Sequence, residues 1–113
     1  MIKIIQLGCS GTLNYGDELS HINVRKIIRK LLPNTYITQF GHKTFILDDF
    51  HNDADNYEIF SKIETCKKLI QECDFWILGP GTVMPFDDKP LFIEFSKLNK
   101  NIIIWGVGCG GTI

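Results

Sequence analysis

Short apolar runs alternate with amphipathic segments along the chain. IKIIQLG, TYITQFG, DFWILG and NIIIWGVG are each brief, rich in β-branched or aromatic residues and bounded by glycine, which predicts four buried β-strands. KTFILDD can form a further short strand. Apolar positions recur with a period near 3.6 between these runs, which predicts three helices. The alternation of strands and helices predicts an α/β fold, a Rossmann-like parallel sheet with helices on both faces.

Local signals set the expected helix limits. The first helix follows the first strand, with Asp17 as its N-cap and Pro33 as its stop. The second helix covers Ile59 to Cys73 and is capped by Asp55 or Asn56. The third helix runs from Leu91 to Leu98, opened by Asp88 and Pro90.

Composition narrows the class of protein. The chain has 113 residues, which suits one domain, residues 1–113, and is too short for two. Twelve basic residues face thirteen acidic ones, so no nucleic-acid partner is indicated, although RKIIRK is locally basic. The longest apolar stretch is far shorter than the ~20 residues of a membrane helix, and the N-terminus lacks the pattern of a secretory signal. We therefore expect a cytoplasmic protein with no membrane span.

Several polar and aromatic residues are assigned to the fold alone. The four cysteines form no C-x-x-C motif, so we expect buried, reduced thiols. The acidic, histidine-bearing residues 42–55 lack the glycine of a calcium loop, so we expect a solvated loop and no metal. His21 is expected at the surface, four residues before Arg25. The side chains of Trp76 and Trp105 are expected in the core.

Three glycine-bearing loops leave the predicted strands at the sheet edge where ligands of open α/β sheets bind. They are GCSGTLNYGDE, GPGT and GVGCGGT. Their glycines either make tight turns or let the backbone approach a ligand. The first loop fits no dinucleotide or phosphate-loop fingerprint. Gly106, Gly108 and Gly111 fit G-x-G-x-x-G, but the helix that should follow and hold a pyrophosphate is missing from the sequence.

The first of these loops favours a neutral polyol over a phosphate. Asp17 and Glu18 place carboxylates at a helix start, where a phosphate would meet like charge. Sugar hydroxyls can instead donate hydrogen bonds to carboxylates. Asn14 adds an amide, and Tyr15 can stack on a sugar face. The alternative is that Asp17 only caps the helix and Glu18 is a solvated charge.

These segments resemble the polysaccharide pyruvyl transferases. NYGDELS resembles that family's N-x-G-D-E/A segment, and CDFWILGPGT resembles its aD-x-x-I-x-G-G-G-T strand and loop. PLFIEFSKLNKNIIIWGVGCG resembles its helix and glycine-rich strand exit. Such enzymes transfer a pyruvyl group from phosphoenolpyruvate to a sugar, forming a cyclic ketal, and have two Rossmann-like halves similar to GT-B glycosyltransferases. The resemblance implies that this chain is the N-terminal, acceptor-side half.

The resemblance also implies roles for residues in the loops. Asp17 is the candidate catalytic residue, which would orient an acceptor hydroxyl or remove its proton. The candidate substrate-binding residues are Asn14, Tyr15, Gly16, Glu18, Gly79, Gly81, Thr82, Gly106 and Gly108. Pro80 replaces a glycine of the family pattern, which removes one backbone donor. Arg25 and Arg29 are expected at the far end of the first helix, so they cannot replace the basic residues that hold phosphoenolpyruvate in the second half.

We therefore expect this chain alone to be inactive, with a sugar or polysaccharide as its ligand and no cofactor. Phosphoenolpyruvate is expected only together with a second half. Two other functions stay open. One is a non-catalytic Rossmann-like module for a nucleotide or flavin. The other is an interaction domain that self-associates as a homodimer through its open face, with Met84 and Phe86 in the loop that continues from GPGT.

Overall fold

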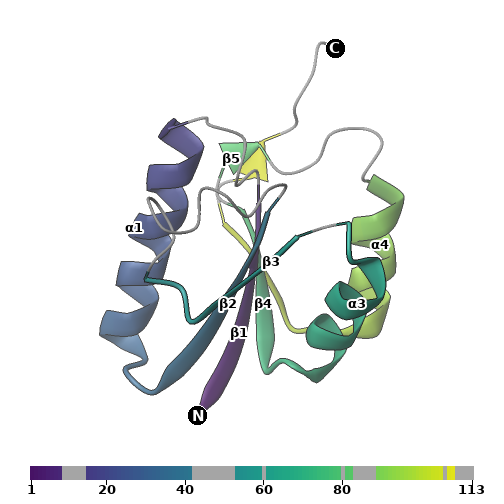
Figure 1. Ribbon diagram of the computed structural model, residues 1–113, viewed down its shortest axis with the longest axis horizontal. Helices are drawn as coiled ribbons and strands as arrows, with labels where there is room; N and C mark the ends of the chain where they lie inside the picture. Colours follow the sequence, from purple (N-terminus) through teal and green to yellow (C-terminus); the bar gives the residue numbers. More distant parts are fainter. Residues whose placement is uncertain are drawn as a thin grey trace.

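Five parallel strands form the main sheet of the computed structural model, which describes residues 1–8, 15–41, 53–59, 61–79, 81–82, 89–105 and 107–108. Their spatial order is β3-β2-β1-β4-β6, and every neighbouring pair is parallel (Figure 1). The strands are β1 Ile2–Leu7, β2 Thr35–Gly41, β3 Asn56–Ile59, β4 Phe75–Leu78 and β6 Ile102–Ile104. The predicted Rossmann-like parallel sheet is confirmed.

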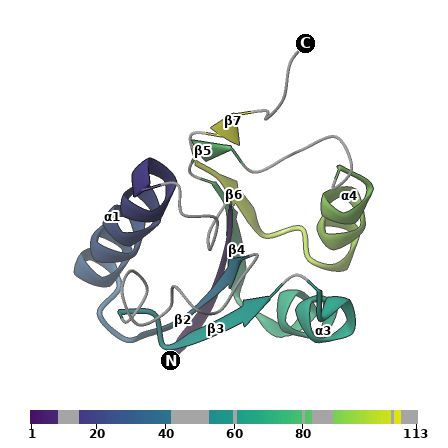
Figure 2. The ribbon, with the colours of Figure 1, turned by 45° about the horizontal axis from the view of Figure 1, so that its top comes forward.

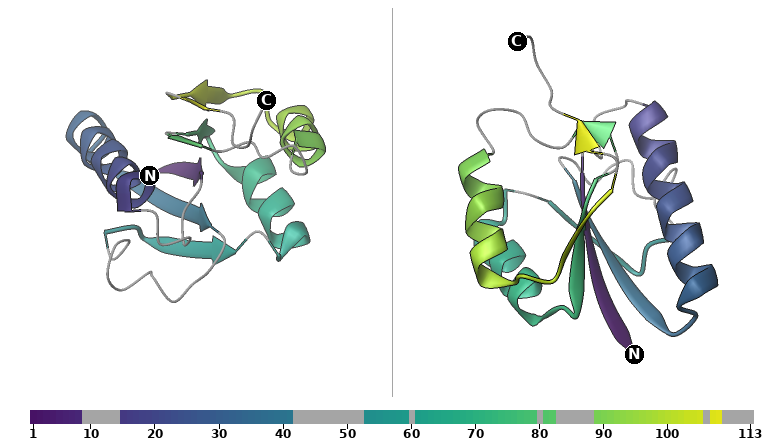
Figure 3. Two further views of the ribbon diagram at one scale, coloured as in Figure 1. Left: turned by 90° about the horizontal axis from the view of Figure 1, so that it is seen from above. Right: turned by 180° about the vertical axis from the view of Figure 1, so that it is seen from behind.

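Helices cover both faces of the sheet, as predicted. Helix α1 (Tyr15–Leu31) lies on one face, and α3 (Ile63–Glu72) and α4 (Lys89–Leu98) lie on the other (Figure 3). A second sheet contains β5 (Gly81–Thr82) and β7 (Val107–Gly108), paired in parallel. Figure 2 shows β5 and β7 beside the upper end of β6, where the main strands finish.

Alternation along the strands divides the core into two clusters, one on each face of the sheet. Under α1, the buried apolar side chains are Ile4, Val24, Ile28, Ile37 and Ile77. Under α3 and α4, they are Ile5, Leu7, Phe40, Cys66, Ile70, Cys73, Trp76, Leu78, Phe92 and Phe95. The central strands β1 and β4 contribute to both clusters, which explains their nearly continuous apolar sequences.

Trp76 anchors the second cluster and is fully buried, as predicted. Its ring lies edge-on to Phe95, with centroids 6.4 Å apart, and its Nε1 donates to the Asn99 carbonyl oxygen at 2.9 Å. Asn99 Nδ2 in turn donates to the carbonyl oxygens of Ile70 and Cys73. Asn99 therefore connects the end of α4 to the end of α3 and to β4.

The cysteine prediction is confirmed where the structure describes it. Cys66 and Cys73 are buried free thiols, whereas Cys9 and Cys109 lie outside the described residues. Burial raises the pKa of the Cys66 thiol to about 12 and that of Cys73 to about 11. Both side chains are therefore neutral at ordinary pH and act as small apolar groups.

Three predicted element limits are wrong. Helix α1 begins at Tyr15, so Asp17 lies inside its first turn and is not its N-cap. Asn56 opens strand β3 instead of capping a helix, because Asn56–Ile59 pairs with β2, and α3 begins only at Ile63. NIIIWGVG is divided, since β6 ends at Ile104 and β7 pairs with β5 instead of continuing the main sheet. The expected strand in KTFILDD lies outside the described residues.

Strand β6 occupies one edge of the main sheet. Ile103 and Ile104 are 43% and 67% exposed. Trp105 is partly buried and packs against the core cluster under α1, so its assignment to the core is confirmed in part. Within the described part of the chain, no helix combines the length and apolar character needed to span a membrane.

Candidate functional site at the carboxyl ends of β1 and β4

The strand order reverses between β1 and β4. From β1 the chain continues through α1 to β2 on one side, whereas from β4 it continues through α4 to β6 on the other. The connections therefore leave in opposite directions at the carboxyl ends of these two strands. In open α/β sheets, such a switch point is where ligands bind.

Gly79 brings the exit of β4 against the end of β1. Its amide donates to the Leu7 carbonyl oxygen at 2.9 Å, and its φ of 114° lies in the left-handed region that favours glycine. The chain then enters β5, where Thr82 pairs with Gly108 of β7. Helix α1 contacts β5. The structure thus brings four of the predicted residues, Gly79, Gly81, Thr82 and Gly108, to one end of the sheet beside α1.

The first turn of α1 contains the predicted residues Tyr15, Gly16, Asp17 and Glu18. Its amino end lies at the same end of the molecule as β5 (Figure 1). Asp17 precedes His21 by four residues and Arg25 by eight, so the three positions lie along one face of the helix. The other two predicted residues, Asn14 and Gly106, lie outside the described part of the chain.

The face of α1 that carries His21 and Arg25 is turned to the sheet, which corrects one expectation. His21 is not at the surface, because its side chain is fully buried, and the side chain of Arg25 is fully buried as well. They lie against Gln6 of β1 and Gln39 of β2, which are also fully buried and are register partners. A polar layer therefore separates the apolar core under α1 from the carboxyl edge of the sheet.

Arg25 is the centre of this layer. Its Nη1 donates to Gln39 Oε1 at 2.6 Å and to Gln6 Oε1 at 3.3 Å. Its Nη2 and Nε donate to the carboxylate of Asp53 at 2.9–3.2 Å. The guanidinium is thus saturated by partners from three segments of the chain, so it is not available to an anionic ligand.

The two glutamines complete the layer. Gln39 Nε2 donates to the Gln6 carbonyl oxygen at 3.2 Å and to the Phe40 carbonyl oxygen at 2.8 Å. Gln6 Nε2 donates to the His21 carbonyl oxygen at 3.4 Å. Each buried amide therefore has partners, as buried polar groups require.

His21 packs on Gly8, the residue that directly follows β1. A Cβ atom added to Gly8 would overlap His21 Nε2 and would lie 2.6 Å from Cε1. The imidazole ring therefore occupies the space that any other residue at Gly8 would need. This contact fixes the helix against the exit of β1.

The acidic segment before β3 is not a solvated loop where the structure describes it. Asp53 pairs with Arg25, and Asp55 pairs with Arg29 at 2.9 Å while also accepting from the Ile37 amide at 2.8 Å. Across the described ranges, no cluster of three His, Cys, Asp or Glu could hold a metal ion. These carboxylates therefore dock the segment onto α1.

The sequence contained a signal for this polar layer. Val24 and Ile28 mark the sheet-facing side of α1, and His21 and Arg25 lie within the same arc. Gln6 and Gln39 likewise follow the buried isoleucines Ile4 and Ile37 by two residues, so each lies on the same face of its strand as that isoleucine. Polar residues at such positions indicate a buried network, since unpaired polar groups are costly in a core.

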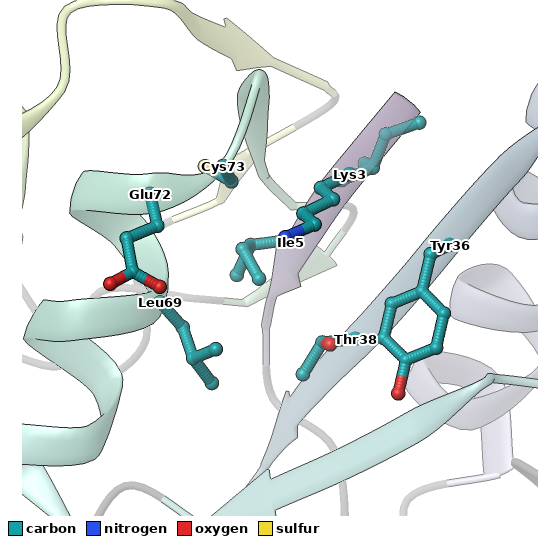
Figure 4. A pocket seen from close by; sticks show the side chains of 8 residues that line it. Lys3, Ile5, Tyr36, Thr38, Leu69, Glu72 and Cys73 are labelled. Atoms are coloured by element: carbon teal, nitrogen blue, oxygen red, sulfur yellow. The ribbon is translucent and has the colours of Figure 1, made fainter. Parts of the chain in front are cut away.

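A separate cavity lies on the opposite face, in the amino-terminal half of the strands. It has a volume of about 100 Å³ and is lined by Lys3, Tyr36 and Thr38 of the sheet and by Leu69, Glu72 and Cys73 at α3 (Figure 4). None of the predicted site residues lines it. Burial raises the pKa of the Cys73 thiol to about 11, so very little of the thiolate form is present at neutral pH.

Comparison of the chain with protein-family models, curated proteins and solved structures gives no match.

Proposed function

We propose that this chain is the acceptor-side domain of a polysaccharide pyruvyl transferase-like enzyme with a GT-B-like arrangement of two halves. Its ligand is a sugar held at the carboxyl ends of β1 and β4. One observation carries the proposal. The first turn of α1, Tyr15–Glu18, and the exit of β4 with Gly79, Gly81 and Thr82 are far apart in sequence, yet both lie at the same switch point of the sheet.

Asp17 is the residue to which we assign the acceptor. Its position continues the sheet-facing row of His21 and Arg25 by one turn, toward the end of β1. A carboxylate there accepts hydrogen bonds from sugar hydroxyls and can take the proton of the attacking one. Phosphoenolpyruvate belongs to a second half, because Arg25 is buried and saturated and Arg29 already pairs with Asp55.

A binding assay tests this function without requiring catalysis. Thermal unfolding is followed for the wild-type chain with sugars, sugar nucleotides, phosphoenolpyruvate, NAD and FMN. A ligand at 100 times its dissociation constant adds about 2.7 kcal/mol, which raises Tm by roughly 10 °C or more in a domain of this size. We expect a response to a sugar and none to phosphoenolpyruvate alone.

Asp17→Asn should abolish the sugar response while leaving the unliganded Tm close to that of the wild type. The matched control is Glu72→Gln, which neutralises an exposed carboxylate of α3, far from the carboxyl edge. A sugar response that survives Asp17→Asn would remove Asp17 from the site. A response to NAD or FMN would instead favour a nucleotide-binding module.

A further inference from the structure

The Arg25 network has a geometry that apolar packing cannot provide. A fully buried arginine is held by side chains from β1, β2 and the segment before β3. Replacing buried ion pairs by apolar residues is often neutral or stabilising, so stability alone does not account for such a group. The planar guanidinium donates in fixed directions, so it defines both the rotation and the axial position of the helix that carries it.

We propose that Arg25 and Asp53 are positioning residues for the carboxyl-edge site. Their ion pair holds α1 over β1 and β2 and thereby keeps the first turn of α1, Tyr15–Glu18, beside the ends of β1 and β4. Asp17 is eight residues from Arg25, a rise of about 12 Å along a continuous helix. The effect of this positioning on ligand binding rests on the proposed function, in which Asp17 binds the sugar.

The apolar cluster under α1 cannot fix the position of the helix alone. Val24 and Ile28 pack on Ile4, Ile37 and Ile77, and such apolar contacts have little directional preference. A small rotation or slide of α1 would preserve most of that burial. The same movement would break the bonds from Arg25 to Gln39 and Asp53, which are 2.6–3.2 Å long.

Two variants two residues apart give a matched test. Asp53→Asn removes the charge that faces Arg25, and Asp55→Asn makes the same change at the ion pair with Arg29, whose side chains are about one-third exposed. Amide hydrogen exchange is measured for residues 15–22 of α1 under conditions in which both variants stay folded. We expect Asp53→Asn to speed exchange there by about tenfold or more, and Asp55→Asn to have a much smaller effect.

Equal exchange in the two variants would overturn the proposal. Arg25→Lys provides a second test, because a lysine keeps the positive charge but lacks the planar set of donors of the guanidinium. We therefore expect this variant to show the same faster exchange as Asp53→Asn. A normal exchange pattern in Arg25→Lys would also contradict the positioning role.

Ligand binding separates this inference from the proposed function. For the sugar that stabilises the wild-type chain most, we expect Asp53→Asn to weaken binding by about tenfold and Asp55→Asn to leave it nearly unchanged. If both variants bind that sugar as the wild type does, the positioning role fails while the sugar site stands. If no sugar binds the wild type, the proposed function fails, and the exchange experiment still decides whether Arg25 and Asp53 position the first turn.

Discussion

Substitution of Gly8 by alanine is expected to destabilise the fold strongly, because the His21 ring occupies the space that the new methyl group needs. The added Cβ would lie 2.6 Å from Cε1 and would overlap Nε2. To restore an ordinary separation of 3.4 Å, Cε1 alone would have to move by about 0.8 Å. His21 is fully buried, so a displaced ring would disturb the packing of α1 on the sheet.

The expected loss of stability follows from this steric overlap. Overpacking a well-packed core costs typically ~1–3 kcal/mol, and we expect Gly8→Ala to reach about 3 kcal/mol because helix and strand must separate. A loss of that size is a large share of the ~5–15 kcal/mol that stabilises an ordinary domain. Urea unfolding followed by tryptophan fluorescence should show a lower midpoint with an unchanged m-value.

A double-mutant cycle identifies the cause. His21→Ala removes the ring, so Gly8→Ala made in that background should cost less than about 1 kcal/mol. If Gly8→Ala costs the same with and without the imidazole, the steric explanation is wrong. A Gly8→Ala chain as stable as the wild type would refute the close packing of α1 on the exit of β1.

Two further predictions concern other parts of the sheet. Gly79→Ala should destabilise the chain by about 1–2 kcal/mol in urea unfolding, since a φ of 114° is strained for any residue with a side chain. In a Cys9→Ser/Cys109→Ser background, neither Cys66 nor Cys73 should react with Ellman's reagent at pH 8 until the chain unfolds. The pKa values of these thiols in the folded chain, about 12 and 11, exceed the unfolded value of 9.0. The free energy of unfolding should therefore fall as the pH rises above 9, by up to ~1.4 kcal/mol per pH unit for each thiol. A free energy of unfolding that does not change above pH 9 would contradict this prediction.

The sequence predicts the sheet well because its strands are buried on both faces. Such strands appear as continuous apolar runs, and IKIIQLG, TYITQFG and DFWILG each correspond to one observed strand. Strand β3 was missed because Asn56–Ile59 carries no apolar run of its own. Its conformation depends on pairing with β2, and that partner is distant in sequence.

The orientation of α1 could not be read from periodicity alone. Leu19, Ile27 and Leu31 belong to the apolar pattern of the helix, yet they are 53%, 44% and 71% exposed. The buried face instead includes His21 and Arg25, because Gln6, Gln39 and Asp53 provide hydrogen-bond partners there. A hydrophobic pattern assumes that polar residues face water, and the assumption fails wherever a polar network is buried.

The two glycines at the switch point are required for different physical reasons, which the sequence alone does not distinguish. Gly8 and Gly79 end the neighbouring strands β1 and β4, and both appear in the sequence simply as strand exits. Gly8 is required by the ring of His21, so a change elsewhere in the chain can relieve its substitution. Gly79 is required by its own backbone conformation, so removing a neighbouring side chain cannot relieve its strain. Substitution of Gly8 therefore tests how α1 packs on the end of β1, and substitution of Gly79 tests how the chain turns from β4 into the candidate site.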